Sequence, residues 1–344
     1  MDAQFLPFIS RMLMLLLVLF AATDAASGAC YETDNFIVDA SSAELARRFG
    51  DAAEQCRSDL AQLWLGKKLP DWSAKCPVKI HADENLGAGG VTSFVFENGE
   101  VFDWKMEIQG SPQRILDSVL PHEITHMVFA SHFRKPLPRW LDEGAATSVE
   151  HRTEKERYRR KLRLFLREDV RKGIPLNQMI LLKDYPADPI PLYAQSFSVV
   201  EYLLEKGEQL NTLPPHAEHC TEHQRLVRFA ESVMQTAMKP GDWKAALQQH
   251  YGIDSLGDLQ TSWLRWVGTD KPMYSTAAAS AEPPEERDFV QKTAGLPVNI
   301  ISAKPPVTYG KSVYDRTKSP QQIPSKLDFA KPIPLAFGNE PFIR

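Results

Sequence analysis

The stretch that decides the fold and the chemistry reads Leu120-Pro121-His122-Glu123-Ile124-Thr125-His126. It contains an H-E-x-x-H pattern, in which two histidines stand four positions apart. On an α-helix, residues at this spacing lie on one face with Cβ atoms about 5–6 Å apart, so both imidazoles can reach a single ion. Zinc accepts such ring nitrogens at about 2.0–2.1 Å. The spacing therefore predicts a metal-binding helix.

Glu123 supplies the second part of the pattern. It follows His122 by one position, so its side chain points beside the metal rather than at it, where it can take a proton from water. A catalytic zinc has three protein ligands and leaves a fourth position to water. We therefore expect Glu123 to be the general base, and one more ligand has to come from elsewhere in the chain.

The third ligand is expected from Trp140-Leu141-Asp142-Glu143-Gly144-Ala145-Ala146, where Glu143 stands seventeen positions after His126. This stretch is predicted to be a helix, because Pro138 suits a first helical turn. Its small residues after Glu143 would let it approach the histidine-bearing helix closely. Asp142 either orients a metal ligand or is an exposed helix carboxylate.

Pro121 conflicts with the helical pattern that precedes it. Ile115, Val119 and Leu120 have helical spacing, but a proline inside a helix removes one hydrogen bond and clashes with the preceding turn. We expect the helix to kink or restart here, so that Pro121 opens the turn that carries His122.

The two motifs together resemble the gluzincin metallopeptidases, in which H-E-x-x-H is followed by a downstream glutamate. The W-L-x-E-G-x-A form is similar to the aminopeptidase branch and, more closely, to the peptidase MA-like families of bacterial exported proteins. The likeness covers residues 35–268, with two specific motifs and weak flanks. It implies zinc bound by His122, His126 and Glu143, with Glu123 as general base.

The resemblance also implies a zincin-like α+β fold. Its N-terminal lobe, residues 30–131, would hold a small mixed sheet, helices and the H-E-x-x-H helix, and residues 132–268 would form an all-helical lobe across an active-site cleft. Related zincins stabilise the oxyanion with a tyrosine or histidine on a later helix, and Tyr193 is at a matching place. The alternative for Tyr193 is a core residue at the start of an apolar helix.

One departure from the aminopeptidases concerns the substrate. In the aminopeptidases the glutamate of a G-x-M-E-N strand binds the free amine of the substrate. The most similar stretch in this chain is Val95-Phe96-Glu97-Asn98-Gly99-Glu100. Asn-Gly between apolar strands is typical of a two-residue hairpin turn, which favours an endopeptidase. The second hairpin strand, 101–108, is expected at the sheet edge beside the cleft, where an extended peptide could add as a further strand.

The chain has 344 residues, 43% of them hydrophobic and 24% charged, which is ordinary for a globular protein. Its net charge of −4 and the absence of a long basic run argue against nucleic acid as a partner. The locally basic stretch 155–171 is predicted to be an amphipathic helix with a solvated face; contact with an anionic surface or substrate is the alternative.

The first 29 residues have the pattern of a signal peptide. Arg11 precedes the apolar run 12–22, which is too short to span a bilayer, and small residues follow it. The mature chain is therefore expected to be exported, periplasmic or secreted, without a membrane span. Cys30 could carry a lipid, but Ser27 stands where such signals prefer a large aliphatic residue, so an unlipidated chain is favoured.

Export permits disulfides, and four cysteines allow three pairings. We favour a Cys56–Cys76 bond, which leaves Cys30 and Cys220 to pair or stay free.

A second histidine cluster, His216, His219, Cys220 and His223, lies in a polar stretch with two prolines. We interpret it as a loop rather than a second metal site.

The remaining pattern predicts ordinary elements and a tail. A helix over 41–65 should begin with a Ser41–Glu44 capping box and bury Leu45, Phe49, Ala52, Cys56, Leu60 and Leu63. Strands are expected at 35–40, 77–82, 91–96 and 101–108, and helices at 154–172, 192–206, 222–238, 243–251 and 255–267. Residues 269–344 hold 11 of the 25 prolines and are expected to be an extended or disordered tail.

These observations favour an exported zinc-dependent metallopeptidase that acts on a peptide or protein substrate, as an endopeptidase. The main alternative is a non-catalytic binding protein on a zincin scaffold. A third reading is a hydrolase of non-peptide amides, because H-E-x-x-H chemistry does not demand a peptide.

Overall fold

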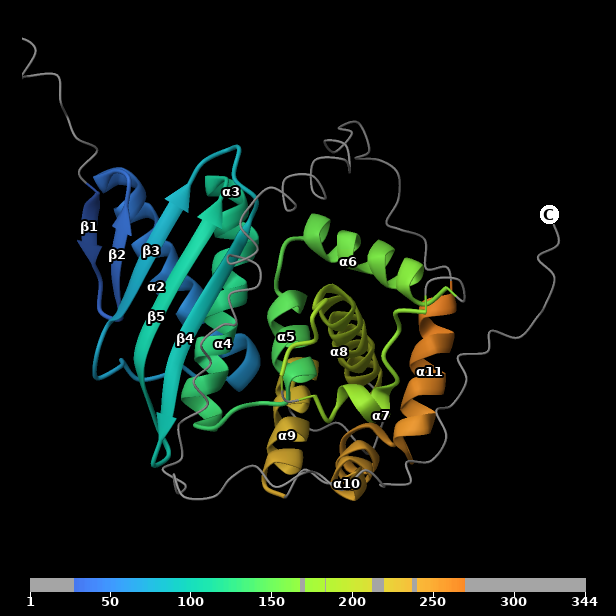
Figure 1. The fold of residues 1–344 in the computed structure, drawn as a ribbon. Helices are drawn as coiled ribbons and strands as arrows, with labels where there is room; N and C mark the ends of the chain where they lie inside the picture. The colour runs from blue at the N-terminus through green and yellow to red at the C-terminus, as the bar shows by residue number, and fades with distance from the viewer. Residues whose placement is uncertain (1–27, 168–170, 183, 212–219, 237–239, 270–344) are drawn as a thin grey trace, which may run out of the picture.

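Figure 1 shows the computed structural model, which describes residues 28–167, 171–182, 184–211, 220–236 and 240–269. The described chain is an α+β protein whose strands all precede residue 111 and whose later elements are helices. The predicted signal peptide and tail lie outside the described residues, apart from positions 28, 29 and 269, and so do His216 and His219. Within the described part, no helix is both long and apolar enough to cross a membrane.

The sheet is mixed and five-stranded, in the order β1-β2-β3-β5-β4. Its strands are β1 (Ala29–Glu32), β2 (Phe36–Ala40), β3 (Cys76–Ala82), β4 (Gly89–Glu97) and β5 (Glu100–Gly110). β3 pairs in parallel with β2 and β5, and the two outer strands run antiparallel to their neighbours. The expectation that the second hairpin strand forms the sheet edge is wrong. β5 pairs with β3 on its far side, so the first hairpin strand, β4, is the edge.

The predicted hairpin turn is confirmed. Asn98 and Gly99 connect β4 to β5, and both have positive φ angles, 53° and 77°. Two positive φ values in a two-residue loop match the twist of antiparallel strands, and asparagine followed by glycine adopts them most easily. Glu97 therefore closes the hairpin opposite Glu100.

One face of the sheet is buried by two helices. Val78, Ile80, Met106 and Ile108 are buried while Lys79 and Glu107 between them are exposed, which is the alternation of a sheet covered on one side. Helix α2 (Ala43–Leu65) contacts β1 and β2, and α4 (Leu120–Phe133) contacts β4 and β5. Figure 1 shows both helices along the sheet, with α4 next to the helical half of the molecule.

Helix α2 differs from its prediction in two ways. Its N-cap is Ser42, whose hydroxyl accepts from the Leu45 N–H, so the capping box does not begin at Ser41. Its buried face includes Phe49, Leu60 and Trp64, whereas Leu63 is exposed. The buried face is rotated because α2 also contacts α4 and α9, and the Trp64 ring lies edge-on to Phe129 of α4.

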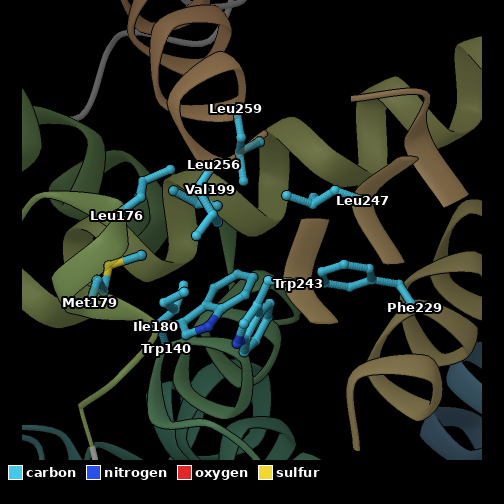
Figure 2. A pocket seen from close by; sticks show the side chains of 10 residues that line it. All are labelled: Trp140, Leu176, Met179, Ile180, Val199, Phe229, Trp243, Leu247, Leu256 and Leu259. Carbon is cyan, nitrogen blue, oxygen red and sulfur yellow. The ribbon is translucent and has the colours of Figure 1, made fainter. Parts of the chain in front are cut away.

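The described part of the chain after Pro138 is helical, as predicted. Its helices are α5 (Arg139–Ser148), α6 (Arg152–Phe165), α7 (Leu176–Met179), α8 (Ile190–Asn211), α9 (Glu222–Met234), α10 (Pro240–Tyr251) and α11 (Leu256–Gly268). Figure 2 shows the apolar side chains that line a small cavity among them. Trp140 of α5 stands beside Trp243 of α10 there, with ring centroids 5.8 Å apart. This packing anchors α5 in the helical core.

The predicted Cys56–Cys76 disulfide is wrong for this structure. Cys30, Cys56 and Cys76 are free thiols, and no disulfide forms within the described part of the chain. Burial raises the pKa of the Cys56 and Cys76 thiols to about 12, so both stay protonated and unreactive at neutral pH.

Gly144 allows a close helix contact, although not the predicted one. A Cβ at this position would lie 2.5 Å from the backbone oxygen of Ser196 and 2.7 Å from Val200, both on α8. The small residue therefore brings α5 against α8 rather than against α4.

Replacing Gly144 by alanine should destabilise the protein by about 1–3 kcal/mol, because the added methyl group must push two helix backbones apart. In an unconstrained helix interior the same change stabilises by about 1 kcal/mol. Urea unfolding measures the difference. Gly268→Ala is the control, since a Cβ there meets nothing within 4 Å. A stability gain in Gly144→Ala would contradict the close contact.

Candidate metal site

A π-helical turn positions the histidine-bearing helix. Residues Ile115–Val119 form this wider turn immediately before α4, and the Leu120 N–H bonds to the Ile115 oxygen, five residues back. Pro121 follows in the first turn of α4, directly after the wider turn, and the backbone at Val119 and Leu120 is already helical. The prediction that Pro121 opens the turn carrying His122 is confirmed, and single π-helical turns are frequent at functional sites.

The three predicted ligands come together between α4 and α5. The Nε2 atoms of His122 and His126 lie 3.5 Å and 3.8 Å from Oε2 of Glu143. One candidate ligand atom from each residue lies within 4.8 Å of the others. All three side chains are largely buried. These separations leave room for one ion among two nitrogens and one oxygen.

A second pair of carboxylates orients the two rings. Nδ1 of His122 lies 2.7 Å from Glu150 Oε1, and Nδ1 of His126 lies 2.9 Å from Asp142 Oδ1. A carboxylate at Nδ1 fixes the proton there and turns Nε2 towards a metal. The Asp142 carboxylate is mostly buried. The structure therefore supports its predicted role in orienting a metal ligand, the His126 ring, over the alternative of an exposed helix carboxylate. Glu150 was not identified from the sequence.

The charges of the site compensate one another. Burial alone would raise the pKa of Glu143, but the hydrogen bond with His122 and the nearby His126 outweigh it and hold the pKa at about 2. Burial alone would lower the pKa of His122, yet hydrogen bonds to Glu143 and Glu150 raise it well above its usual value. A divalent cation would replace the proton of the His122 imidazolium as the positive partner of Glu143, so binding it would release a proton.

Glu123 lies beside the ligands and next to the sheet edge. Its side chain is buried, with 5% of the residue exposed. A Cβ on Gly90 of β4 would lie 2.7 Å from Glu123 Oε1. The backbone of the edge strand therefore approaches the candidate general base closely, and it can do so because residue 90 has no side chain.

Two tyrosines border the ligands on the helical side. Tyr193, in the first turn of α8, is largely buried, and its ring centroid is 6.1 Å from that of Tyr185. Burial, followed by the negative charges of Glu143 and Glu123, raises the pKa of Tyr193 well above its usual value. Its hydroxyl therefore stays protonated and can donate a hydrogen bond.

Tyr185 was not identified from the sequence, because it lies outside any helix or strand and no spacing marks it. Its hydroxyl donates to Oε1 of Glu143. Among the residues that the structure describes, the second histidine cluster supplies no further group of three metal-ligating side chains.

Two imidazoles and one carboxylate suit zinc, which takes this donor set in catalytic sites with three protein ligands. The structure adds that both rings are fixed by carboxylates on their far nitrogens. The residues present therefore fit a zinc ion.

No model of a known protein family matches the chain, and no curated protein matches it significantly. The chemical interpretation of the site therefore depends on its own residues and their geometry.

Replacing Glu150 by glutamine should lower zinc affinity about 10–100-fold, because the neutral amide orients the His122 ring less strongly. Competition with a chromogenic chelator measures the affinity. Glu156→Gln is the control, since Glu156 pairs with Arg152 at 3.4 Å on α6 and does not contact the ligands. Equal affinities for Glu150→Gln and the unchanged protein would contradict the orienting role.

Proposed function

We propose that the protein is an exported, zinc-dependent metallopeptidase of the gluzincin type that hydrolyses peptide bonds within a chain. The observation that supports this most is the convergence of His122, His126 and Glu143, with ligand atoms within 4.8 Å of one another. A buried carboxylate on the same helix turn, Glu123, completes the set needed to activate water.

The chemistry divides between the metal and the chain. Zinc held by His122, His126 and Glu143 would lower the pKa of water to near 7 and polarise the scissile carbonyl. Glu123 takes the proton from the attacking water and delivers it to the leaving amine. Tyr193, kept protonated by its buried and acidic surroundings, donates a hydrogen bond to the oxygen that becomes negative.

The substrate would bind along β4. Among the described residues this strand pairs with β5 alone, so its other edge would offer main-chain groups to an extended peptide. The contact between Gly90 and Glu123 would bring such a peptide to the general base. The proposal implies a zincin-like arrangement, in which the sheet and α4 would lie on one side of an active-site cleft and helices α5–α11 on the other.

The position of Glu97 favours an endopeptidase. Glu97 lies seven residues beyond Gly90 along β4, at the hairpin end. At about 3.3 Å per strand residue, the two positions are about 23 Å apart. Glu97 is thus too far from Glu123 to hold the amino group next to the bond being cut.

Glu123→Gln should abolish hydrolysis while zinc stays bound, because the amide cannot accept the proton. Cleavage of a denatured-protein mixture, with and without chelator, and metal analysis are the two measurements. Glu97→Gln serves as the matched control and should keep full activity. Turnover by Glu123→Gln would refute the general base, and zinc bound without any hydrolysis by the unchanged protein would favour the non-catalytic binding protein.

Gly90→Ala should reduce turnover at least tenfold with little change in zinc content. Its methyl group would fall 2.7 Å from Glu123 Oε1 and 2.9 Å from Ile108, so the carboxylate or the strand must shift. Rates on a fluorogenic peptide measure the effect, because small misplacements of a catalytic group cost large factors. Gly87→Ala is the control, since a Cβ there meets nothing within 4 Å. Equal rates for both variants would contradict the approach of β4 to Glu123.

A further inference from the structure

The two carboxylate oxygens of Glu143 face different partners. Oε2 is the oxygen that lies 3.5 Å and 3.8 Å from the Nε2 atoms of His122 and His126. Oε1 accepts a hydrogen bond from the Tyr185 hydroxyl. Only 4% of the Glu143 side chain is exposed, so water competes little for either oxygen. The carboxylate is therefore held in one orientation by contacts on both sides.

Tyr185 is itself held by Arg139, the first residue of the helix that carries Glu143. The Arg139 guanidinium lies over the Tyr185 ring, 4.6 Å from its centroid, and Nη1 donates to the phenolic oxygen at 3.2 Å. Arg139 is 6% exposed. A donor at the phenolic oxygen polarises the O–H group and strengthens the bond that this group donates in turn. Stacking and hydrogen bonding together fix the tyrosine ring.

We propose that Tyr185, braced by Arg139, is a positioning residue that keeps Glu143 a one-oxygen metal ligand. A carboxylate can bind a metal through one oxygen or through both. With Oε1 engaged by Tyr185, Oε2 and the two imidazoles supply three ligand atoms, which leaves the fourth position to water. Without the hydroxyl, Oε1 would be available to bind the ion in addition to water, which would raise the coordination number above four. This inference rests on the metal-dependent function proposed above.

Tyr185→Phe tests the inference, with Tyr251→Phe as the matched control. The Tyr251 hydroxyl is also buried but has no hydrogen-bond partner within the described structure, so its loss reports the general effect of removing a buried phenolic oxygen. The probe is Co²⁺ in place of zinc, because its visible absorption is strong in four-coordinate sites and weak in sites of higher coordination number.

Tyr185→Phe should weaken the visible Co²⁺ absorption several-fold and lower kcat at least tenfold with little change in KM. Tyr251→Phe should leave the spectrum and both constants unchanged. An unchanged Co²⁺ spectrum in Tyr185→Phe, with Co²⁺ bound, would overturn the role of Tyr185 alone. Failure of the unchanged protein to bind Co²⁺ through its histidines would instead contradict the proposed function.

Arg139→Lys tests the bracing. Lysine keeps the charge but lacks the planar group that stacks and donates in a fixed direction. The visible Co²⁺ absorption of Arg139→Lys should weaken as in Tyr185→Phe, but by a smaller factor. The double variant should match Tyr185→Phe alone, because Arg139 acts through the tyrosine. Additive losses would show that Arg139 acts by another route and would overturn this part of the proposal.

Discussion

The contact between α4 and α5, made by two imidazoles and one buried carboxylate, is the constraint on which the candidate site depends. His122 and His126 belong to the helix that covers the sheet, and Glu143 belongs to a helix embedded in the helical part of the molecule that follows it. Buried charges are tolerated only when they are paired. The requirement to pair these charges therefore joins the two halves of the molecule at the place where the chemistry is proposed to occur.

The surroundings of that contact make it rigid. Glu150 and Asp142 hold the far nitrogens of the two rings, and Tyr185 holds the far oxygen of Glu143. Each of the three ligand side chains thus has a partner on the side opposite the position proposed for the metal. Such outer contacts set the orientation of ligands before any ion binds and commonly decide metal affinity.

The sequence predicted what is encoded within a few residues. The spacing of His122 and His126, the place of Pro121 in the turn that carries His122 and the Asn98-Gly99 turn are local patterns, and the structure has each of them. The features that the sequence did not predict are those that depend on tertiary packing. Glu150 and Tyr185 carry no spacing signal, and the identity of the edge strand depended on β5 pairing with β3. The buried face of α2 was rotated for the same reason, since α4 and α9 add contacts that periodicity alone does not reveal.

X-ray absorption at the zinc edge of the zinc-loaded protein tests the central claim most directly. The account predicts two imidazole nitrogens at about 2.0–2.1 Å, oxygen ligands at about 2.0–2.2 Å and no sulfur. Loss of one oxygen ligand in Glu143→Ala, with both imidazoles retained, would identify the carboxylate. A sulfur shell at about 2.3 Å, or a spectrum without imidazole scattering, would contradict the account.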